Sequence, residues 1–246
     1  MRERGLSGNL LKGLACLSML VDHMGHLLFP QLHWMRWVGR LALPLFAYFL
    51  AEGCRHTRNR ARYFGRMLGL GCLCQAVYLL VQWQSGGNRF VVLNILLTLA
   101  VAQLLCFTWL DFLATLSDSD RKKTGLAAGR FLLMVVATVA LCRLGQVTQV
   151  LWNITVEFDY GLAGMLLPLA ALVGRTPATR LAAFGLGLVL FCFSFCGGMP
   201  YVWFALPVLP LLLLYSGKRG SRRWQPVFYV FYPAHLAVLY GLQFLL

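Results

Sequence analysis

The first apolar stretch of the sequence carries an amine and an imidazole at a spacing that places both on one face of a helix. Lys12 and His23 are 11 residues apart, which is about 20° from three full helical turns and about 16 Å along the helix axis. An imidazole changes its charge near neutral pH, so His23 could act as a general base. Asp22 stands beside His23 and four residues before His26, a spacing that allows the two to touch on an adjacent face. Ionisable groups are costly inside a bilayer, so these neighbours indicate a functional site.

Three further polar residues are expected at the depth of His23. Arg40 lies about one turn inside the second apolar run, Asn94 is placed similarly in a later one, and Asp159 begins another. These side chains would converge with His23 in the outer half of the bilayer. Arg40 and Asn94 could then stabilise a carbonyl oxygen as it becomes negative. Asp22 or Asp159 could orient the imidazole.

A second polar group is expected at the opposite end of the same runs. It consists of Lys12, Glu52, Arg55, His56, Arg58 and Arg60, followed by arginines up to Arg66. Guanidinium groups bind phosphate well, so this group could hold an anionic ligand. The arginines could equally mark one side of the membrane, and Lys12 could extend its amine to the interface. Glu52, together with Tyr232 and His235 in the last run, is a candidate for substrate binding, although His235 could also be a core histidine that hydrogen-bonds a neighbour.

The elements that carry these residues are expected to be membrane-spanning helices. The chain is 59% hydrophobic and 12% charged, with a mean hydropathy of +0.70, whereas soluble domains carry roughly twice that charged fraction. Gln146–Phe158 has apolar residues at helical spacing and is interpreted as an interfacial or partly re-entrant helix. Apolar runs of bilayer length predict about nine spans (8–10), at residues 10–29, 37–54, 64–83, 90–113, 126–144, 160–174, 180–196, 199–215 and 226–246.

The basic residues predict the orientation of these spans. With nine spans, one set of loops holds 18 Lys and Arg residues and the other holds 4, which accounts for all 22 in the chain. The positive-inside rule then places the N-terminus in the cytoplasm. Because the basic residues fall in short clusters between apolar runs, nucleic acid is not expected as a partner. We therefore predict an all-α, multi-pass bundle, residues 1–246 forming one domain in the cytoplasmic (inner) membrane.

The eight cysteines do not suggest a metal or disulfide site. Nearly all fall inside apolar runs, without a CxxC pair or a spacing to histidine that is typical of metal ligands. They are interpreted as small buried side chains, and no metal is expected.

Motifs along nearly the whole chain resemble those of the TraX family, most specifically up to Tyr63 and from Tyr215 onward. The chain departs from the family pattern at Gln75–Tyr78, where an acid and a Pro-Phe pair are common, and at Ser216, where Asn is usual. Both departures bear on the acceptor more than on the chemistry. The matching segments are Leu11–Gly13, Ser18–Gly25, Phe29-Pro30, Arg36–Phe46, Glu52-Gly53, His56–Arg60, Asn94–Thr98, Asp159–Gly161, Tyr215–Gly220 and Phe228–His235.

The resemblance implies an enzyme. The family is named for a conjugal-transfer protein that N-acetylates pilin, and it is similar to a wider transmembrane acyltransferase group that includes the heparan glucosaminide acetyltransferase. A basic residue, ten intervening positions and a histidine mark one branch of that group, and Lys12 with His23 fits this pattern. The resemblance implies that acetyl-CoA, or another acyl-CoA, donates an acyl group from the cytoplasm to an amine or hydroxyl. We expect His23 to be the base in a direct transfer, with an acyl-histidine intermediate as the less favoured variant.

Other functions remain open on the residues alone. Intramembrane charges also suit a transporter or channel, His23 and His235 could be the axial ligands of a b-type haem, and a purely structural scaffold is a further alternative. The expected partners are the lipid bilayer and a small-molecule, glycan or peptide acceptor. A second copy of the chain is a further candidate partner.

Overall fold

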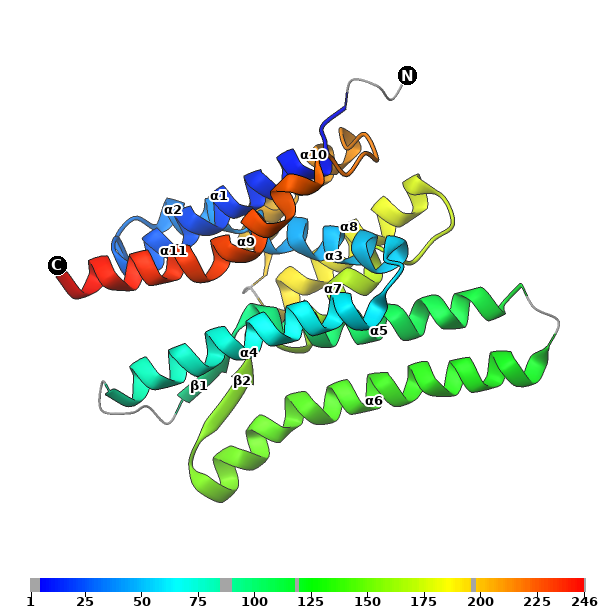
Figure 1. Cartoon of the computed structure of the whole chain (residues 1–246), viewed down its shortest axis with the longest axis horizontal. Coiled ribbons are helices and arrows are strands. Elements are labelled where there is room, and N and C mark those ends of the chain that lie inside the picture. Colours follow the sequence, from blue (N-terminus) through cyan, green and yellow to red (C-terminus); the bar gives the residue numbers. More distant parts are fainter. Residues whose placement is uncertain (1–4, 85–89, 118–119, 196–197, 246) are drawn as a thin grey trace. The chain divides into compact units, whose positions relative to one another are not determined.

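The computed structural model is helical apart from one short pair of strands, which confirms the expected all-α class (Figure 1). It describes residues 5–84, 90–117, 120–195 and 198–245. Within these residues, four helices are long and apolar enough to cross a membrane: Arg60–Trp83, Ile95–Thr115, Arg121–Trp152 and Pro177–Ser194. The total of about nine spans and the cytoplasmic N-terminus stay predictions.

The chain forms two compact units. Residues 1–49 and 177–246 make up one, here called the terminal unit, and residues 50–176 make up the other, the middle unit. The single domain expected over 1–246 stays a prediction. The terminal unit contains α1 (Gly8–Leu27), α2 (His33–Gly39), the start of α3 (Ala42–His56), α8 (Pro177–Phe195), α9 (Met199–Ala205), α10 (Val208–Leu213), the 3-10 turn η1 (Arg222–Trp224) and α11 (Gln225–Leu245).

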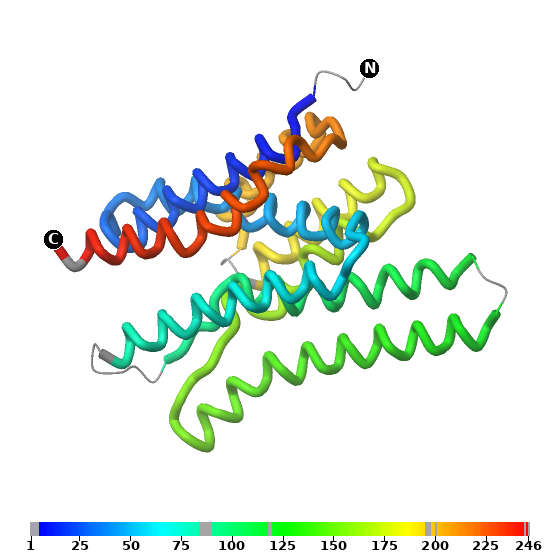
Figure 2. The backbone as a smooth tube through the Cα atoms, viewed as in Figure 1, coloured from blue at the N-terminus to red at the C-terminus, as the bar shows by residue number. Residues whose placement is uncertain are grey.

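The first and last helices lie side by side in the terminal unit. The Lys12 amine stands 6.0 Å from the centre of the Phe228 ring, and three turns further on the His23 imidazole contacts His235. Residue numbers rise together along both helices, so α1 and α11 run in the same direction (Figure 2). Lys12 and His23 therefore share one face of α1, as their spacing predicts.

Two glycines let α2 approach α1 closely. A Cβ atom on Gly25 would lie 2.7 Å from the Cβ of Met35, and one on Gly39 would overlap the side chain of Asp22. Only a residue without a side chain allows backbones this near to each other. This contact positions Arg36 and Arg40 of the α2 segment beside the second half of α1.

The middle unit is a helical unit with a small parallel sheet. It contains the rest of α3, then α4 (Arg60–Gln84), β1 (Phe90–Leu93), α5 (Ile95–Thr115), α6 (Arg121–Trp152), β2 (Thr155–Phe158) and α7 (Gly161–Ala170). The α5–α6 pair returns the chain, so that β1 and β2 pair in parallel from Phe90 with Thr155 to Leu93 with Phe158. The side chain of Asn94 caps α5 by accepting from Leu96 N–H.

The prediction of an interfacial helix at Gln146–Phe158 is wrong. The helix α6 continues to Trp152 and stops at Asn153, whose backbone is left-handed with φ 53°. Asparagine adopts this conformation more readily than most residues and commonly ends helices. The next residues, Thr155–Phe158, are rich in β-branched and aromatic side chains and instead pair with β1.

Three expected spans are not single helices. The run 37–54 is divided between α2 and α3, and a new helix at Ala42 suits Pro44, since proline is best accommodated in the first turn of a helix. The run 199–215 is divided into α9 and α10 at Pro207, which lacks the N–H that would continue the helix. The run 90–113 begins as strand β1. Hydropathy alone does not detect these breaks.

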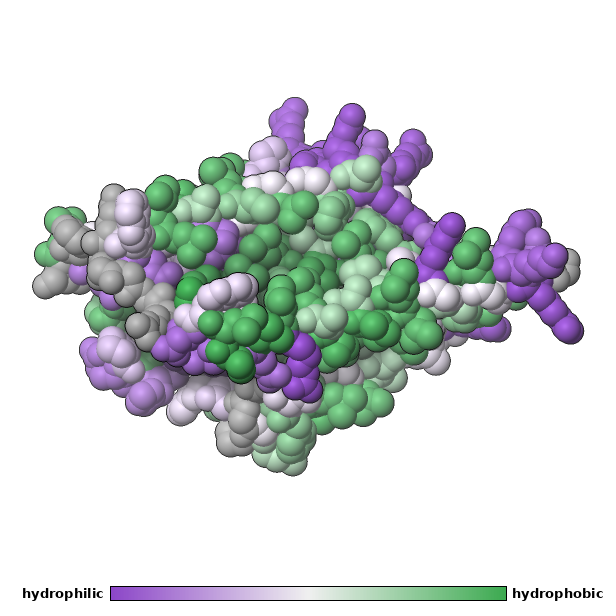
Figure 3. Space-filling view, turned by 90° about the horizontal axis from the view of Figure 1, so that it is seen from below, coloured by the Kyte–Doolittle hydropathy of each residue, from purple (hydrophilic) through white to green (hydrophobic). Residues whose placement is uncertain are grey.

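The longest helix exposes many apolar side chains along its length. In α6, 32 residues long, the buried residues are Ala127, Thr138 and Gly145, while Leu133 and Val150 are 69% and 83% exposed. In Figure 3 hydrophobic side chains cover much of the face and hydrophilic ones gather toward its margins. Such a surface is stable against lipid tails and not against water.

Replacing Gly39 with Ala should destabilise the protein by about 1–3 kcal/mol, because the new methyl group overlaps Asp22 at a helix contact that has no spare room. The matched control is Gly13→Ala in α1, where nothing lies within 4 Å of the added Cβ. That change should be neutral or slightly stabilising. Thermal unfolding of the two variants in detergent checks this, and equal melting temperatures would contradict the proposed close packing.

Candidate active site

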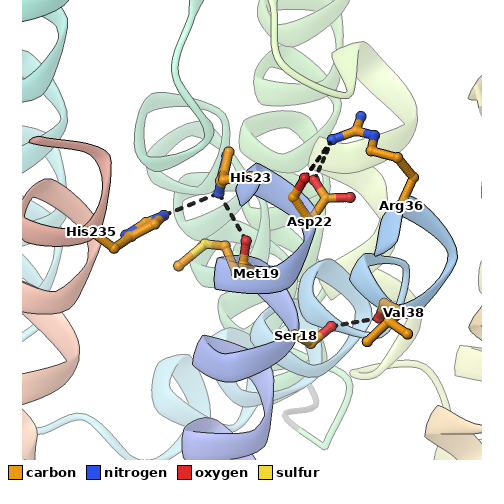
Figure 4. A network of polar contacts seen from close by, with 7 residues as sticks. All are labelled: Ser18, Met19, Asp22, His23, Arg36, Val38 and His235. Carbon is orange, nitrogen blue, oxygen red and sulfur yellow. Dashed lines mark hydrogen bonds and ion pairs between the residues drawn. The ribbon is translucent and has the colours of Figure 1, made fainter. Parts of the chain in front are cut away.

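Two histidines from opposite ends of the chain meet between α1 and α11 (Figure 4). His235 Nε2 lies 3.0 Å from His23 Nδ1, with ring centres 5.0 Å apart. Each Nδ1 also contacts the backbone carbonyl one turn back in its own helix. The distance from His23 Nδ1 to the Met19 oxygen is 3.0 Å, and that from His235 Nδ1 to the Phe231 oxygen is 2.8 Å. The rings of Phe231 and Tyr232 pack against His235. Backbone, packing and the partner imidazole together fix both rings.

These contacts determine which ring nitrogens carry hydrogen. A carbonyl oxygen only accepts, so His235 Nδ1 must donate to Phe231, which leaves His235 Nε2 as an acceptor in the neutral ring. His23 Nδ1 faces two acceptors, the Met19 carbonyl and His235 Nε2, so it must be the protonated nitrogen of that ring. The lone pair of neutral His23 is then on Nε2, which has no hydrogen-bond partner among the described residues. This is the form of imidazole that can take a proton from another molecule.

The distance between the two rings does not suit a haem iron held between these nitrogens. A metal–imidazole bond is about 2 Å long, so two nitrogens on opposite sides of one iron would be about 4 Å apart. The 3.0 Å between His23 Nδ1 and His235 Nε2 is a direct hydrogen bond.

Asp22 turns away from the histidines and pairs with α2. Its Oδ2 accepts from Arg36 Nη1 at 2.7 Å, and the same guanidinium donates to the Asp22 carbonyl at 3.3 Å. Asp22 is buried and Arg36 is about one-third exposed. The contact with His26 that the spacing allows is therefore replaced by an ion pair to Arg36, because the glycine at position 39 brings α2 within reach. Ser18, one turn earlier, donates to the Val38 carbonyl at 2.7 Å and fastens the same contact.

Arg40 follows α2 and has unsatisfied donors. Its guanidinium carbon lies 4.8 Å from the centre of the Tyr201 ring. Its Nε is buried and, within the described part of the chain, has no hydrogen-bond partner. A buried N–H donor without an acceptor costs free energy. This group is therefore available to an oxygen atom from outside the chain.

Lys12 is held by aromatic rings at the other end of α1. Its amine stands 5.2 Å from the centre of the Phe49 ring and 6.0 Å from that of Phe228. Among the described residues it makes no ion pair. The structure therefore places the Lys12 amine beside rings of α3 and α11, and its extension to a membrane interface stays a prediction.

The remaining candidate residues belong to the middle unit. The Asn94 amide donates to the Gly71 carbonyl at 2.8 Å and to Gln75 Oε1 at 2.9 Å, so both its hydrogens join α4 to the start of α5. The Asp159 carbonyl accepts from Thr98. The expected convergence of Asn94 and Asp159 with His23 and Arg40 stays a prediction.

Some of the basic residues at the end of α3 and the start of α4 are paired with acids of the middle unit. Glu52 pairs with Arg55 at 3.2 Å and lies 3.4 Å from His56. Arg60 pairs with Asp111 at 2.6 Å, and Arg58 is exposed. Donor binding by this group also stays a prediction.

Sequence reasoning missed three parts of the site. It assigns no role to Arg36, to Tyr201 or to the mutual contact of the two histidines. The one available signal is that Asp22 lies inside an apolar run, where it needs a partner, and that Arg36 brings the opposite charge just before the next run.

Residues 7–243 match the model of a family described as TraX protein. This chain belongs to the TraX family. It is 31% identical over 245 aligned residues to the "Probable fimbrial assembly protein FimC, serogroup H1" of Dichelobacter nodosus, covering 93% of this chain and 92% of that protein. It is 27% identical over 254 aligned residues to Protein TraX of Escherichia coli, covering 94% and 85%.

No solved structure matches this TraX-family chain. Its apolar helices and its family together identify it as a membrane protein. Both His23 and His235 lie inside the segment that matches the TraX model.

Replacing Arg36 with Ala should destabilise this TraX-family protein by about 1–3 kcal/mol, because the buried Asp22 carboxylate loses its partner. The loss is smaller than for a fully buried pair because the guanidinium is partly exposed. Adding Asp22→Asn should recover most of it, since the neutral amide needs no counter-charge. Unfolding of the single and double variants in detergent measures the coupling, and strictly additive losses would argue against the ion pair.

Proposed function

We propose that this protein is a membrane-embedded acyltransferase that moves an acetyl group from acetyl-CoA, or another acyl group from its CoA ester, to an amine or hydroxyl. The observation that carries the proposal is the state of His23, with Nδ1–H held by Met19 and His235 and with Nε2 unoccupied. The family resemblance supplies the reaction class, since TraX is associated with acetylation of pilin. The acceptor of this chain is an amine or hydroxyl that reaches His23.

The reaction balances with His23 as the only proton carrier. His23 Nε2 takes a proton from the acceptor while the acceptor nitrogen or oxygen attacks the thioester carbonyl carbon. The new C–N or C–O bond forms and the C–S bond breaks. The departing CoA thiolate then takes the proton from Nε2, which restores the neutral imidazole.

His235 has a positioning role in this scheme. When His23 gains a proton, its Nδ1–H becomes a charge-assisted donor to His235 Nε2, and that hydrogen bond strengthens as the positive charge develops. The bond from His235 Nδ1 to Phe231 keeps the accepting nitrogen aimed at His23. A base that is oriented by a further group is the usual arrangement in nucleophilic and acid–base catalysis. Asp22, paired with Arg36, is not needed for this task.

Arg40 is the best candidate to stabilise the carbonyl oxygen as it becomes negative. Its buried Nε–H lacks an acceptor, and donors already in place when the charge develops are worth most in a site without water. The amide of Asn94 is already used between α4 and α5, so we assign it no part in the reaction. Glu52 and Tyr232 remain candidate acceptor contacts.

Replacing His23 with Ala should lower kcat/KM for acetyl transfer by about 10²–10⁴-fold, because the reaction loses its base. His26→Ala is the matched control, since it removes an exposed imidazole from the same helix and should leave transfer unchanged. Labelled acetyl-CoA and a panel of amine and hydroxyl acceptors measure both variants, with monodispersity in detergent as the folding check. Normal turnover by folded His23→Ala would remove the assignment, and a trapped acetyl group on His23 would replace direct transfer by an acyl-enzyme route.

His235→Phe should lower kcat about tenfold or more while the donor KM changes little, because a hydrogen bond to a charged group is lost but the ring volume is kept. His235→Gln keeps an acceptor oxygen and should restore part of the lost kcat. Steady-state kinetics of both variants separate the two effects. If Phe and Gln reduce kcat equally, or if the change is confined to KM, the positioning role is wrong.

A further inference from the structure

A basic loop is fastened to the start of α1. Backbone hydrogen bonds run from Gly8 N–H to the Lys218 carbonyl at 2.9 Å and from Asn9 N–H to the Arg219 carbonyl at 3.0 Å. The Asn9 side chain also donates to the Ser221 carbonyl at 2.7 Å. Gly220 has φ 88°, and a Cβ there would lie 2.8 Å from the Asn9 amide nitrogen. The loop between α10 and α11 therefore has a defined path along the first turn of α1.

This loop carries positive charge that no acid among the described residues of the terminal unit neutralises. Arg219 lies near enough to Lys12 for their charges to repel, and the loop cations are exposed and make no ion pair among the described residues. Of the two acids in this unit, Asp22 is paired with Arg36 and Glu3 lies outside the described residues. The group, here called the loop cations, consists of Lys218, Arg219, Arg222 and Arg223. Clustered like charges raise the free energy of the empty loop, and a bound polyanion lowers it.

We propose that the loop cations bind the phosphate groups of the acyl-CoA donor, an inference that rests on the proposed function. Phosphates offer several charged acceptor oxygens, and guanidinium groups match them in geometry as well as charge. Lys12 is the next cation along α1 and continues the positive charge toward the helix pair.

The direction of α1 connects the loop cations to the histidine pair. From the loop, α1 runs past Lys12 and reaches His23 about three turns later, about 16 Å along the axis. The helix α11, which follows the loop directly, runs the same way and brings His235 to His23. A donor anchored by its phosphates at the loop has a long, thin arm with the thioester at its far end, and that arm is the part that can extend toward His23.

The loop cations differ from Arg55 and Arg60, two of the arginines first considered for an anionic ligand. Arg55 and Arg60 already have carboxylate partners, so a phosphate would have to displace an acid to bind them. The loop cations give up no acidic partner among the described residues.

The test measures binding of CoA to the purified full-length protein, by calorimetry or by equilibrium dialysis of labelled CoA. Arg219→Gln with Arg222→Gln should raise the Kd for CoA about tenfold or more, the scale expected for lost charge-assisted contacts. The matched control, Arg121→Gln with Lys122→Gln, removes the same charge from exposed positions at the start of α6 and should leave the Kd unchanged. S-acetylpantetheine lacks the nucleotide phosphates, so transfer from this donor should be equal in the loop variant and in the wild type.

Three outcomes separate the possibilities. An unchanged Kd for CoA in a monodisperse loop variant overturns the inference. If the loop variant binds CoA normally but loses a dependence of activity on anionic phosphatidylglycerol vesicles, the loop binds lipid headgroup phosphate and the inference is likewise overturned. If the wild type binds CoA through the loop but transfers no acetyl group to any acceptor, the donor site stands and the proposed function falls.

Discussion

A hydrogen bond between two imidazoles that are 212 residues apart in sequence is the contact on which the candidate site depends. It requires α1 and α11 to lie side by side with matched direction, and it requires each ring to be held by a carbonyl of its own helix. In a bilayer, polar side chains gain little from the solvent and must find partners inside the protein. The same constraint explains why Asp22 pairs with Arg36 and why Ser18 bonds to the Val38 carbonyl. Ser18, Asp22 and His23 of α1 thereby each hold a neighbouring segment in place.

How much of the candidate site can be predicted from the sequence depends on how close together in sequence the interacting residues are. The spacing of Lys12 and His23 follows from helical geometry alone, and the two side chains share one face of α1 as predicted. That this face contacts α11 is not predicted from the sequence. The partner of His23 is not readable, because nothing local relates it to His235. For Asp22 the sequence does suggest a partner, but a different residue takes that place. Its spacing to His26 favours a contact within the helix, but the close approach of Gly39 brings Arg36 nearer, and a guanidinium is the stronger partner for a carboxylate.

The fold divides in the same way. Hydropathy locates the long apolar helices α4, α5, α6 and α8, since length and composition are properties of one segment. It does not reveal that Thr155–Phe158 is a strand, because apolar residues at helical spacing also suit a short strand once Asn153 has ended the helix and β1 offers an edge. Prolines at positions 44 and 207 do signal breaks, yet a hydropathy window averages over them. Non-local pairing and single backbone positions therefore account for the differences.

The residues proposed for donor binding and for proton transfer all come from the two ends of the chain. The loop cations, Lys12, His23 and His235 all belong to the terminal unit, so on our proposal donor binding and proton transfer need no residue of the middle unit. The family departure at Gln75 lies in the middle unit, where its side chain accepts from the Asn94 backbone and amide and donates to the Val92 carbonyl. Substitution at this position removes hydrogen bonds that join α4 to β1 and to the start of α5. On our proposal, the departure at Gln75 therefore lies outside the residues assigned to donor binding and proton transfer.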